Sequence, residues 1–250
     1  MKYLFLLGGH DLEMVEIRNI LDENNIEYID KNLSWGAKLS DYIASYDIEI
    51  KLNDKNTTLV SVELTNDSNM EIENLIEIDH HNEKADFPAA IEQVAKLLNI
   101  KLTREQLLIA ENDKGYIPKM IEFGATKEEI AEIRKLDRMM QGVTDEDEKL
   151  AVESIKDKKT IDGIILVESK TSKFSPVVDR LYPFEKLLIY TENNLTYYGK
   201  HAKLLGKKYS EILNDKVYFG GQGEGYFGIS GEKITEQLLN DIISKINEKN

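Results

Sequence analysis

Short apolar runs alternate with helical patterns along the first half of the chain. An apolar run over residues 3–9 is followed by a helical pattern that starts at Leu12. Further strand-like runs span residues 58–64 and 75–79, and another helical pattern follows over residues 87–98. This alternation predicts an α/β fold with a mostly parallel sheet and helices on both faces. In such a sheet, binding sites form where strands pass into the loops that follow them.

Helix boundaries are also marked in the sequence. Thr103 and Thr126 each begin a segment with capping-box spacing, and Gly142 is placed to end the second of these helices. An acidic segment at residues 144–148 comes next. Its charges fit either a domain boundary or the first turn of a linker helix.

After this acidic segment the pattern changes to shorter strands, which predicts a second, smaller domain of α/β or α+β type. The predicted strands span residues 162–168, 187–191, 195–199 and 217–220. A final helical pattern runs from Ile234 to Ile246 and would cover the second sheet. We therefore predict a first domain at residues 1–143, a linker at 144–160 and a second domain at 161–250.

Composition limits the partners of the protein. The 250 residues carry a net charge of −14, which disfavours long duplex DNA but allows small phosphorylated molecules or short oligonucleotides where a cation offsets the local charge. The absence of cysteine excludes disulfides, thiolate metal sites and cysteine nucleophiles. The apolar run near the N-terminus is too short for a secretory signal or a membrane span, so we expect a soluble cytoplasmic protein with no membrane partner. A homodimer is compatible with the sequence.

Three of the four histidines, His10, His80 and His81, lie just after predicted strands. Because the carboxyl ends of parallel strands meet at one edge of a sheet, these residues can become neighbours there. Acidic residues lie at or near comparable junctions: Asp11, Glu13, Glu63, Asp67 and Asp113. Imidazoles mixed with carboxylates are suitable ligands for Mn²⁺, Fe²⁺, Mg²⁺ or Zn²⁺. Alternatively, Asp11 and Glu13 have only a structural role, in which their charges complement the dipole of the helix predicted to start at Leu12.

The segment Ile78-Asp79-His80-His81-Asn82 resembles the Asp-His-His signature of the DHH phosphoesterase superfamily. The family pattern also has a histidine and acids after the first strand, an acid after an intervening strand, and an aspartate in a later helix-associated segment. The chain fills these places in the same order, with His10-Asp11-Leu12-Glu13, with Glu63 or Asp67, and with Glu111-Asn112-Asp113.

This resemblance implies a metal-dependent phosphohydrolase, either a phosphodiesterase or a phosphatase, with two divalent ions, usually Mn²⁺. By similarity, one ion would be held by His10, Asp11 and Glu63. The other ion would be held by Glu13, Glu63, His80 and Asp113. Glu63 would bridge the two ions, with Asp67 as the alternative bridging acid.

The remaining roles also follow from the resemblance. Asp79 would orient an imidazole, and His81 would face the phosphate as a donor or a leaving-group acid. The second half of the chain resembles the DHHA1 domain that commonly follows in this superfamily. Its glycine-rich segment would contact the substrate, through Gly220, Gly221, Gln222 and Gly223. His201 belongs to a small basic group that would either bind phosphate or form solvated surface.

The chain departs from the family pattern in three places. The segment from His10 to Glu13 lacks three spacer residues, and glutamates at 13 and 63 stand where aspartates are usual. The glycine-rich segment lacks the usual histidine and adds Glu224. These departures support a second hypothesis, a divergent non-hydrolytic regulatory protein that retains metal or nucleotide binding.

Overall fold

The chain forms two compact units, Met1–Gly142 and Val143–Asn250, and each has its own hydrophobic core. The computed structural model describes residues 2–33, 36–43, 56–67, 72–221 and 223–248. The first unit carries the predicted metal ligands, and the second carries the glycine-rich segment.

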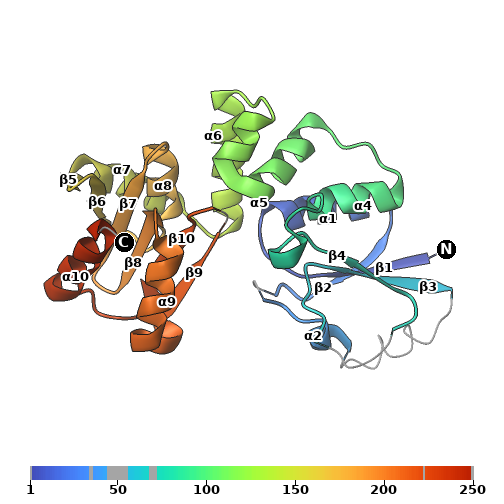
Figure 1. Cartoon of the computed structure of the whole chain (residues 1–250). Coiled ribbons are helices and arrows are strands. Elements are labelled where there is room, and N and C mark those ends of the chain that lie inside the picture. Colours follow the sequence, from blue (N-terminus) through green and yellow to red (C-terminus); the bar gives the residue numbers. More distant parts are fainter. Residues whose placement is uncertain (1, 34–35, 44–55, 68–71, 222, 249–250) are drawn as a thin grey trace. The chain divides into compact units, whose positions relative to one another are not determined.

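A four-stranded parallel sheet forms the centre of the first unit (Figure 1). Its strands lie in the order β2-β1-β3-β4, and every neighbouring pair is parallel. These strands are β1 (Lys2–Leu7), β2 (Glu27–Asp30), β3 (Thr57–Val62) and β4 (Leu75–Ile78). Most of β1 is buried between its neighbours and both covering layers, which explains why its sequence is a continuous apolar run. The predicted parallel sheet is therefore confirmed.

Helices cover both faces of this sheet, as predicted. On one face, α1 (Leu12–Glu23) and α4 (Ala90–Leu98) pack over Phe5 and Leu7. On the other face, α2 (Ser40–Ile43) places Tyr42 in a core with Leu4 and Leu6. The two sets of β1 side chains alternate because successive residues of a strand point to opposite faces. The remaining helical elements of this unit are the 3-10 turn η1 (Asn82–Lys84), α5 (Arg104–Glu122) and α6 (Lys127–Met140).

The predicted helix boundaries are confirmed at α5 and α6. The Thr103 hydroxyl caps α5 and the Thr126 hydroxyl caps α6, each within a complete capping box. Gly142 follows α6 with a φ of 79°, the left-handed conformation that commonly ends a helix. The capping pattern does not predict the bend inside α5, which lies at Gly115 and Tyr116.

A six-stranded mixed sheet forms the second unit, with the strand order β5-β6-β7-β8-β10-β9. β6 and β7 are parallel, and the other neighbouring pairs are antiparallel. The strands are β5 (Lys159–Ile161), β6 (Ile164–Glu168), β7 (Lys186–Tyr190), β8 (Asn194–Gly199), β9 (Val217–Gly220) and β10 (Tyr226–Ser230). This mixed sheet confirms the expected second α/β or α+β region.

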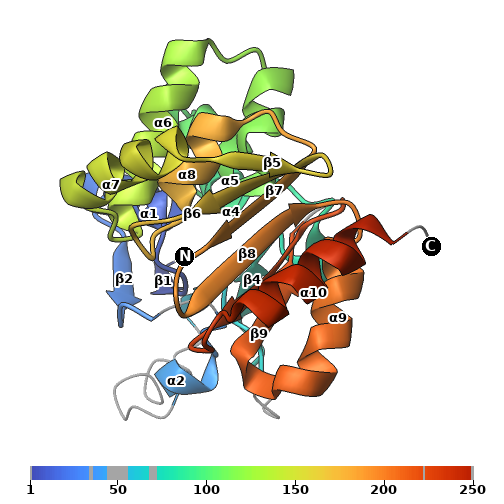
Figure 2. The same cartoon turned by 90° about the vertical axis from the view of Figure 1, so that its left-hand side faces the viewer.

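Two helices pack on one face of the second sheet (Figure 2). They are α9 (Ala202–Leu213) and α10 (Glu236–Asn247), and Tyr209 of α9 stacks on Phe227 of β10 with ring centres 5.6 Å apart. The other helical elements are α7 (Asp145–Lys156), α8 (Ser175–Leu181) and the 3-10 turn η2 (Asn214–Lys216). The mostly apolar interface between sheet and helices forms the second core.

α7 occupies most of the segment that we expected to be a linker. It packs against α8 and β6, so the helix belongs to the second unit. The helix in this segment is observed, whereas the linker boundaries at residues 144 and 160 stay a prediction.

Within the described part of the chain, no helix is both long and apolar enough to cross a lipid bilayer.

Candidate metal centre

The carboxyl ends of β1, β3 and β4 meet at one edge of the first sheet. The ladder of backbone hydrogen bonds continues past the strands: the Gly8 N–H donates to the Val62 carbonyl, and the Glu63 N–H donates to the Ile78 carbonyl, each at 2.8 Å. Glu63 is thereby placed between the turn that follows β1 and the Asp-His-His segment that follows β4. Parallel pairing alone therefore brings these segments together.

Three carboxylates from separate segments converge on the imidazole of His80. His80 Nε2 lies 2.7 Å from Asp113 Oδ2, 3.4 Å from Glu63 Oε1 and 3.5 Å from Glu13 Oε2. A compact group of one ligand atom each from Glu63, His80, His81 and Asp113 fits within 4.8 Å. The structure thus gathers five of the predicted site residues at one point.

The atoms that face one another at this point are buried. Among the described residues, four of these atoms make no hydrogen bond of good geometry, although the imidazole nitrogen lies within ion-pair distance of the three oxygens: Glu13 Oε2, Glu63 Oε1, His80 Nε2 and Asp113 Oδ2. Buried polar atoms without partners are costly, and carboxylates aimed at one point repel one another. A divalent cation would remove both costs, and carboxylate oxygen with imidazole nitrogen is a donor set that such ions accept. The residues present therefore fit a metal ion.

The pKa values of the group reflect this crowding of charge. Burial raises the pKa of Glu13 well above its usual value, and the charge of Asp113 raises it further. Burial by itself lowers the pKa of His80, but the carboxylates around it outweigh burial and raise that pKa to about 12. A ligating imidazole must be neutral and a ligating carboxylate ionised, so metal binding here would release protons.

Glu13 is fixed by the start of α4 as well as by α1. Its Oε1 accepts a hydrogen bond from the Ile91 N–H at 3.1 Å, which leaves Oε2 facing His80. The side chain of Glu13 is almost fully buried. Because the amide of α4 holds one oxygen, the direction of the other oxygen is set by the packing of two helices.

Asp11 and His10, the predicted ligands of a first ion, lie differently. Asp11 caps α1, and its Oδ1 accepts a hydrogen bond from the Met14 N–H at 2.9 Å. Burial, and then the charges of Asp113 and Glu63, raise the pKa of Asp11 to about 8, so this carboxyl lies near the group. His10 is exposed. The structure does not bring either residue into the compact group of ligand atoms found among the described residues.

His81 lies at the exposed side of the group, with about half of its side chain accessible. Its Nδ1 lies 3.1 Å from Asp79 Oδ1, and the His81 backbone N–H donates to the same oxygen at 3.0 Å. Hydrogen bonds from His81 lower the pKa of Asp79 even though burial acts in the opposite direction. An ionised carboxylate accepts only, so Nδ1 carries the proton of this bond. Asp79 therefore orients His81 rather than His80.

The choice between Glu63 and Asp67 as the central acid follows from their contacts. Asp67 accepts hydrogen bonds from the Ser40 N–H at 3.0 Å and from the Ser40 hydroxyl at 2.7 Å, at the start of α2. Those bonds lower the pKa of Asp67, which is exposed. Glu63, in contrast, has 7% of its side chain exposed and faces His80. Glu63 is the acid in the group.

The predicted substrate-binding glycines lie in the second unit. Gly220 ends β9, and a Cβ built on Gly225 would lie 1.9 Å from the Gly220 carbonyl oxygen. Gly221 and Gly223 have φ angles of 81° and 57°, a conformation that favours glycine. Gln222 lies outside the described residues. These glycines meet the backbone demands of a tight turn, so their predicted role in substrate binding remains a prediction.

His201, the remaining predicted substrate residue, precedes α9. Its backbone N–H donates to Glu224 Oε2 at 2.7 Å. The carboxylate of Glu224 therefore already accepts the hydrogen bond that the His201 N–H could otherwise donate to a phosphate. A phosphate at this donor would have to displace that carboxylate.

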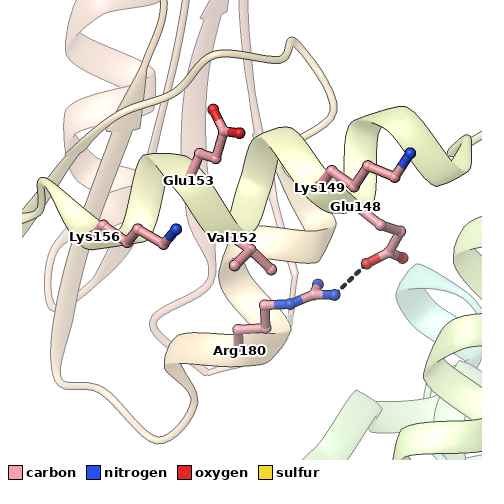
Figure 3. Close-up of a pocket in the computed structure, with 6 residues that line it drawn as sticks. All are labelled: Glu148, Lys149, Val152, Glu153, Lys156 and Arg180. Carbon is pink, nitrogen blue, oxygen red and sulfur yellow. Dashed lines mark ion pairs between the residues drawn. The ribbon is translucent and has the colours of Figure 1, made fainter.

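A surface hollow in the second unit lies along α7 and the end of α8 (Figure 3). Two residues of its wall, Arg180 and Glu148, form an ion pair at 2.5 Å, and a third, Glu153, pairs with Lys170 outside the hollow at 3.0 Å. The other residues of its wall are Lys149, Val152 and Lys156. None of the predicted site residues lines this hollow, and we assign it no role.

Two solved structures resemble the chain over almost all of its length. A DHH-domain member of the s1p family of ribosomal proteins has 12% sequence identity and a TM-score of 0.54, with 98% of this chain and 86% of that chain covered. The pGpG-specific phosphodiesterase PggH from Vibrio cholerae has 14% identity and a TM-score of 0.51, with 98% of both chains covered. The chain has the DHH-domain fold. No family model and no curated protein matches the sequence.

The DHH-domain fold of this chain includes a buried polar layer that the sequence did not single out. Arg134, Asp137 and Arg138 of α6 are each about 95% buried. They recur at helical spacing on the side of α6 that also buries Ile133. Charged residues at core-facing positions of an amphipathic helix are a signal that could have identified this layer.

Proposed function

We propose that the chain is a divalent-metal-dependent phosphohydrolase of the DHH kind that acts on a small phosphorylated molecule or a short oligonucleotide. The observation that carries this proposal is the buried convergence of three carboxylate oxygens, from Glu13, Glu63 and Asp113, on His80 Nε2, with no hydrogen bond of good geometry at these atoms in the described part of the chain. The likeness in fold to a pGpG-specific phosphodiesterase supports a small nucleotide as the substrate class.

A bound divalent ion would supply a Lewis acid for the phosphoryl group and an activated water. Glu13, Glu63, His80 and Asp113 are the residues proposed to hold it. A second ion at His10 and Asp11, with Glu63 as the bridge, is a separate proposal, and Mn²⁺ is the first ion to test for both. The predicted cytoplasmic location also stays a proposal.

His81 is proposed to contact the leaving group. Asp79 accepts from Nδ1, so Nε2 is the ring nitrogen left to face a substrate. The exposure of the His81 side chain gives a substrate access to it. His81 would donate a proton or a hydrogen bond to the phosphate ester oxygen.

The first prediction is metal-dependent phosphodiesterase activity. Protein treated with EDTA and dialysed is assayed with bis(p-nitrophenyl) phosphate, p-nitrophenyl phosphate and pGpG, with and without Mn²⁺. We expect hydrolysis of at least one substrate only with metal, and a loss of about 100-fold or more in His80→Ala and Asp113→Ala.

The matched control is Asp67→Asn. Asp67 follows β3, as Glu63 does, but its carboxylate accepts hydrogen bonds from Ser40 and does not face His80. This variant should keep its activity. Hydrolysis that survives His80→Ala, or no hydrolysis of any of the three substrates, would contradict the proposal.

Metal analysis separates hydrolysis from the alternative function, a non-hydrolytic binding protein. The alternative is favoured by the exposed His10, which lies outside the compact group of ligand atoms in the described chain. Two bound ions per chain favour catalysis. One ion or none, together with inactivity, favours binding alone.

A further inference from the structure

α5 bends two residues after Asp113, the acid whose oxygen lies nearest to His80 Nε2. Gly115 has φ −173° and ψ 27°, Tyr116 has φ 62° and ψ −152°, and Pro118 lies in the first turn after the bend. The left-handed φ of Tyr116 is costly for a residue with a Cβ and persists only where its neighbours hold it in place. The place of Asp113 therefore depends on what holds the bend.

Arg134 of α6 contacts α5 just before the bend, at Asn112, and in the bend itself, at Tyr116. Its Nη1 donates to Asn112 Oδ1 at 2.9 Å, and its guanidinium carbon lies 4.3 Å from the centre of the Tyr116 ring. The same Nη1 lies 2.5 Å from Asp137 Oδ2, which balances the charge. Arg134 is 6% exposed, so these contacts are made in a buried layer.

The shape of the guanidinium group suits this position. A planar group with several fixed N–H donors can donate to an amide oxygen and a carboxylate while its face stacks on a ring. A lysine ammonium has neither the fixed set of N–H donors nor a planar face that can stack on a ring. Asn112 immediately precedes Asp113, so the hydrogen bond to Asn112 fixes the backbone next to the metal-binding acid.

We propose that Arg134 is a positioning residue for the metal centre: it holds Asn112 before the bend and Tyr116 within it, and thereby sets the Asp113 carboxylate beside His80. This inference rests on the proposed function, because it concerns the affinity of the same cation site. In this proposal Arg134 acts through Asn112 and Tyr116 and is not itself a ligand of the cation.

The test is Mn²⁺ binding by isothermal titration calorimetry to the full chain after EDTA treatment and dialysis. Arg134→Lys keeps the charge, and Arg134→Met removes it. We expect the dissociation constant for Mn²⁺ to rise about 10–100-fold in both variants, as is typical when a residue that orients a metal ligand is replaced. The number of ions bound per chain should stay that of the unmodified protein.

Arg104→Met is the matched control. Arg104 also lies in α5, pairs with Glu129 Oε1 at 2.6 Å, and lies 5.8 Å from the Phe123 ring centre. It is exposed at the start of the helix, far along the chain from the bend. Its loss should change the Mn²⁺ dissociation constant by less than about twofold, which is within the range of surface substitutions.

The binding curve distinguishes positioning from a role in folding alone. Partial unfolding lowers the number of ions bound per chain, whereas a misplaced Asp113 raises the dissociation constant at an unchanged number. If Arg134→Met does not fold, Arg134→Lys and Asn112→Ala decide the question, and both should weaken binding. Wild-type affinity in folded Arg134→Lys would overturn the inference. No Mn²⁺ binding by the unmodified protein would overturn the proposed function and this inference together.

Discussion

Gly8 lies against the backbone of Glu63, the first residue after β3 and one of the proposed metal ligands. A Cβ built on Gly8 would lie 2.4 Å from the Glu63 carbonyl oxygen and 2.8 Å from Leu64 Cδ2. Because the nearest atom belongs to the backbone, it cannot move aside by a side-chain rotation. We expect Gly8→Ala to lower the free energy of unfolding by about 1–3 kcal/mol and to weaken Mn²⁺ binding. Urea denaturation and calorimetric titration measure the two effects.

Gly220→Ala is the control for Gly8→Ala. A Cβ on Gly220 would lie 3.5 Å from Tyr226 Oη, which is an ordinary contact. This variant should bind Mn²⁺ with unchanged affinity. If Gly8→Ala and the unmodified protein bind Mn²⁺ with equal affinity, the close approach of Gly8 to Glu63 does not affect the affinity of the proposed metal centre.

The residues of the centre differ in how well the sequence predicts them. Glu63 directly follows β3 and His80 lies two residues after β4, so the parallel pairing of these strands predicts that the two residues meet. His10 also follows a strand, but Asp11 caps α1 and the chain turns before the cap, which leaves His10 exposed. The position of Asp113 depends on a bend held by a residue of another helix, which local sequence patterns do not contain.

At the scale of the element, the N-terminus of α7 is held by one carboxylate. Asp147 Oδ2 accepts from the Thr144 N–H at 2.9 Å and from its hydroxyl at 2.7 Å, and Asp147 Oδ1 accepts from the Thr171 hydroxyl at 2.5 Å. Asp147→Ala removes these acceptors at once. We expect the free energy of unfolding to fall by about 1–2 kcal/mol at pH 7 in urea denaturation.

The effect of Asp147→Ala should depend on pH. Hydrogen bonds from Thr171 and then from Thr144 lower the pKa of Asp147. A carboxyl whose folded pKa is lowered contributes stability above its unfolded pKa of about 3.9, and this stability is lost as the pH falls through the folded pKa. The difference between variant and unmodified protein should therefore shrink below about pH 4. A control, Glu146→Ala, removes an exposed acid of the same turn and should cost less at every pH.

Elements are predicted well where the signal is local. The capping boxes at Thr103 and Thr126 locate α5 and α6 because each box is complete within four residues of sequence. The sequence does not indicate β10 or α9, since the strand contains Gly228 and the helix follows His201, which has a left-handed φ and no side-chain cap. The pairing of β10 with β8 and β9 comes from contacts across the sheet.

At the scale of the molecule, the two units have separate cores, and the proposed metal ligands lie in only the first of them. Mn²⁺ should therefore stabilise one unit. At about 100 times its dissociation constant, a ligand adds about 2.7 kcal/mol to the unit that binds it. In differential scanning calorimetry of the full chain, we expect Mn²⁺ to raise the melting temperature of one transition by several degrees and to leave the other where it is.

His80→Ala serves as the control in this experiment, because it removes the ligand at the centre of the group and should abolish the shift. The heat signal of the unaffected transition should match that of the second unit. An equal shift of both transitions by Mn²⁺, or a single transition that moves as a whole, would show that the units do not melt separately.

The ligands of the proposed centre are spread over the sequence, from Glu13 in the first helix to Asp113 in α5. A chain that emerges from the ribosome exposes its histidine pair well before the acid that completes the coordination group. Until then, the nascent protein offers a cation only a partial set of donors, and long loops must close before the last donor arrives. An ion held by this proposed group would therefore bind late in the folding of the first unit, after the chain has been synthesised through Asp113.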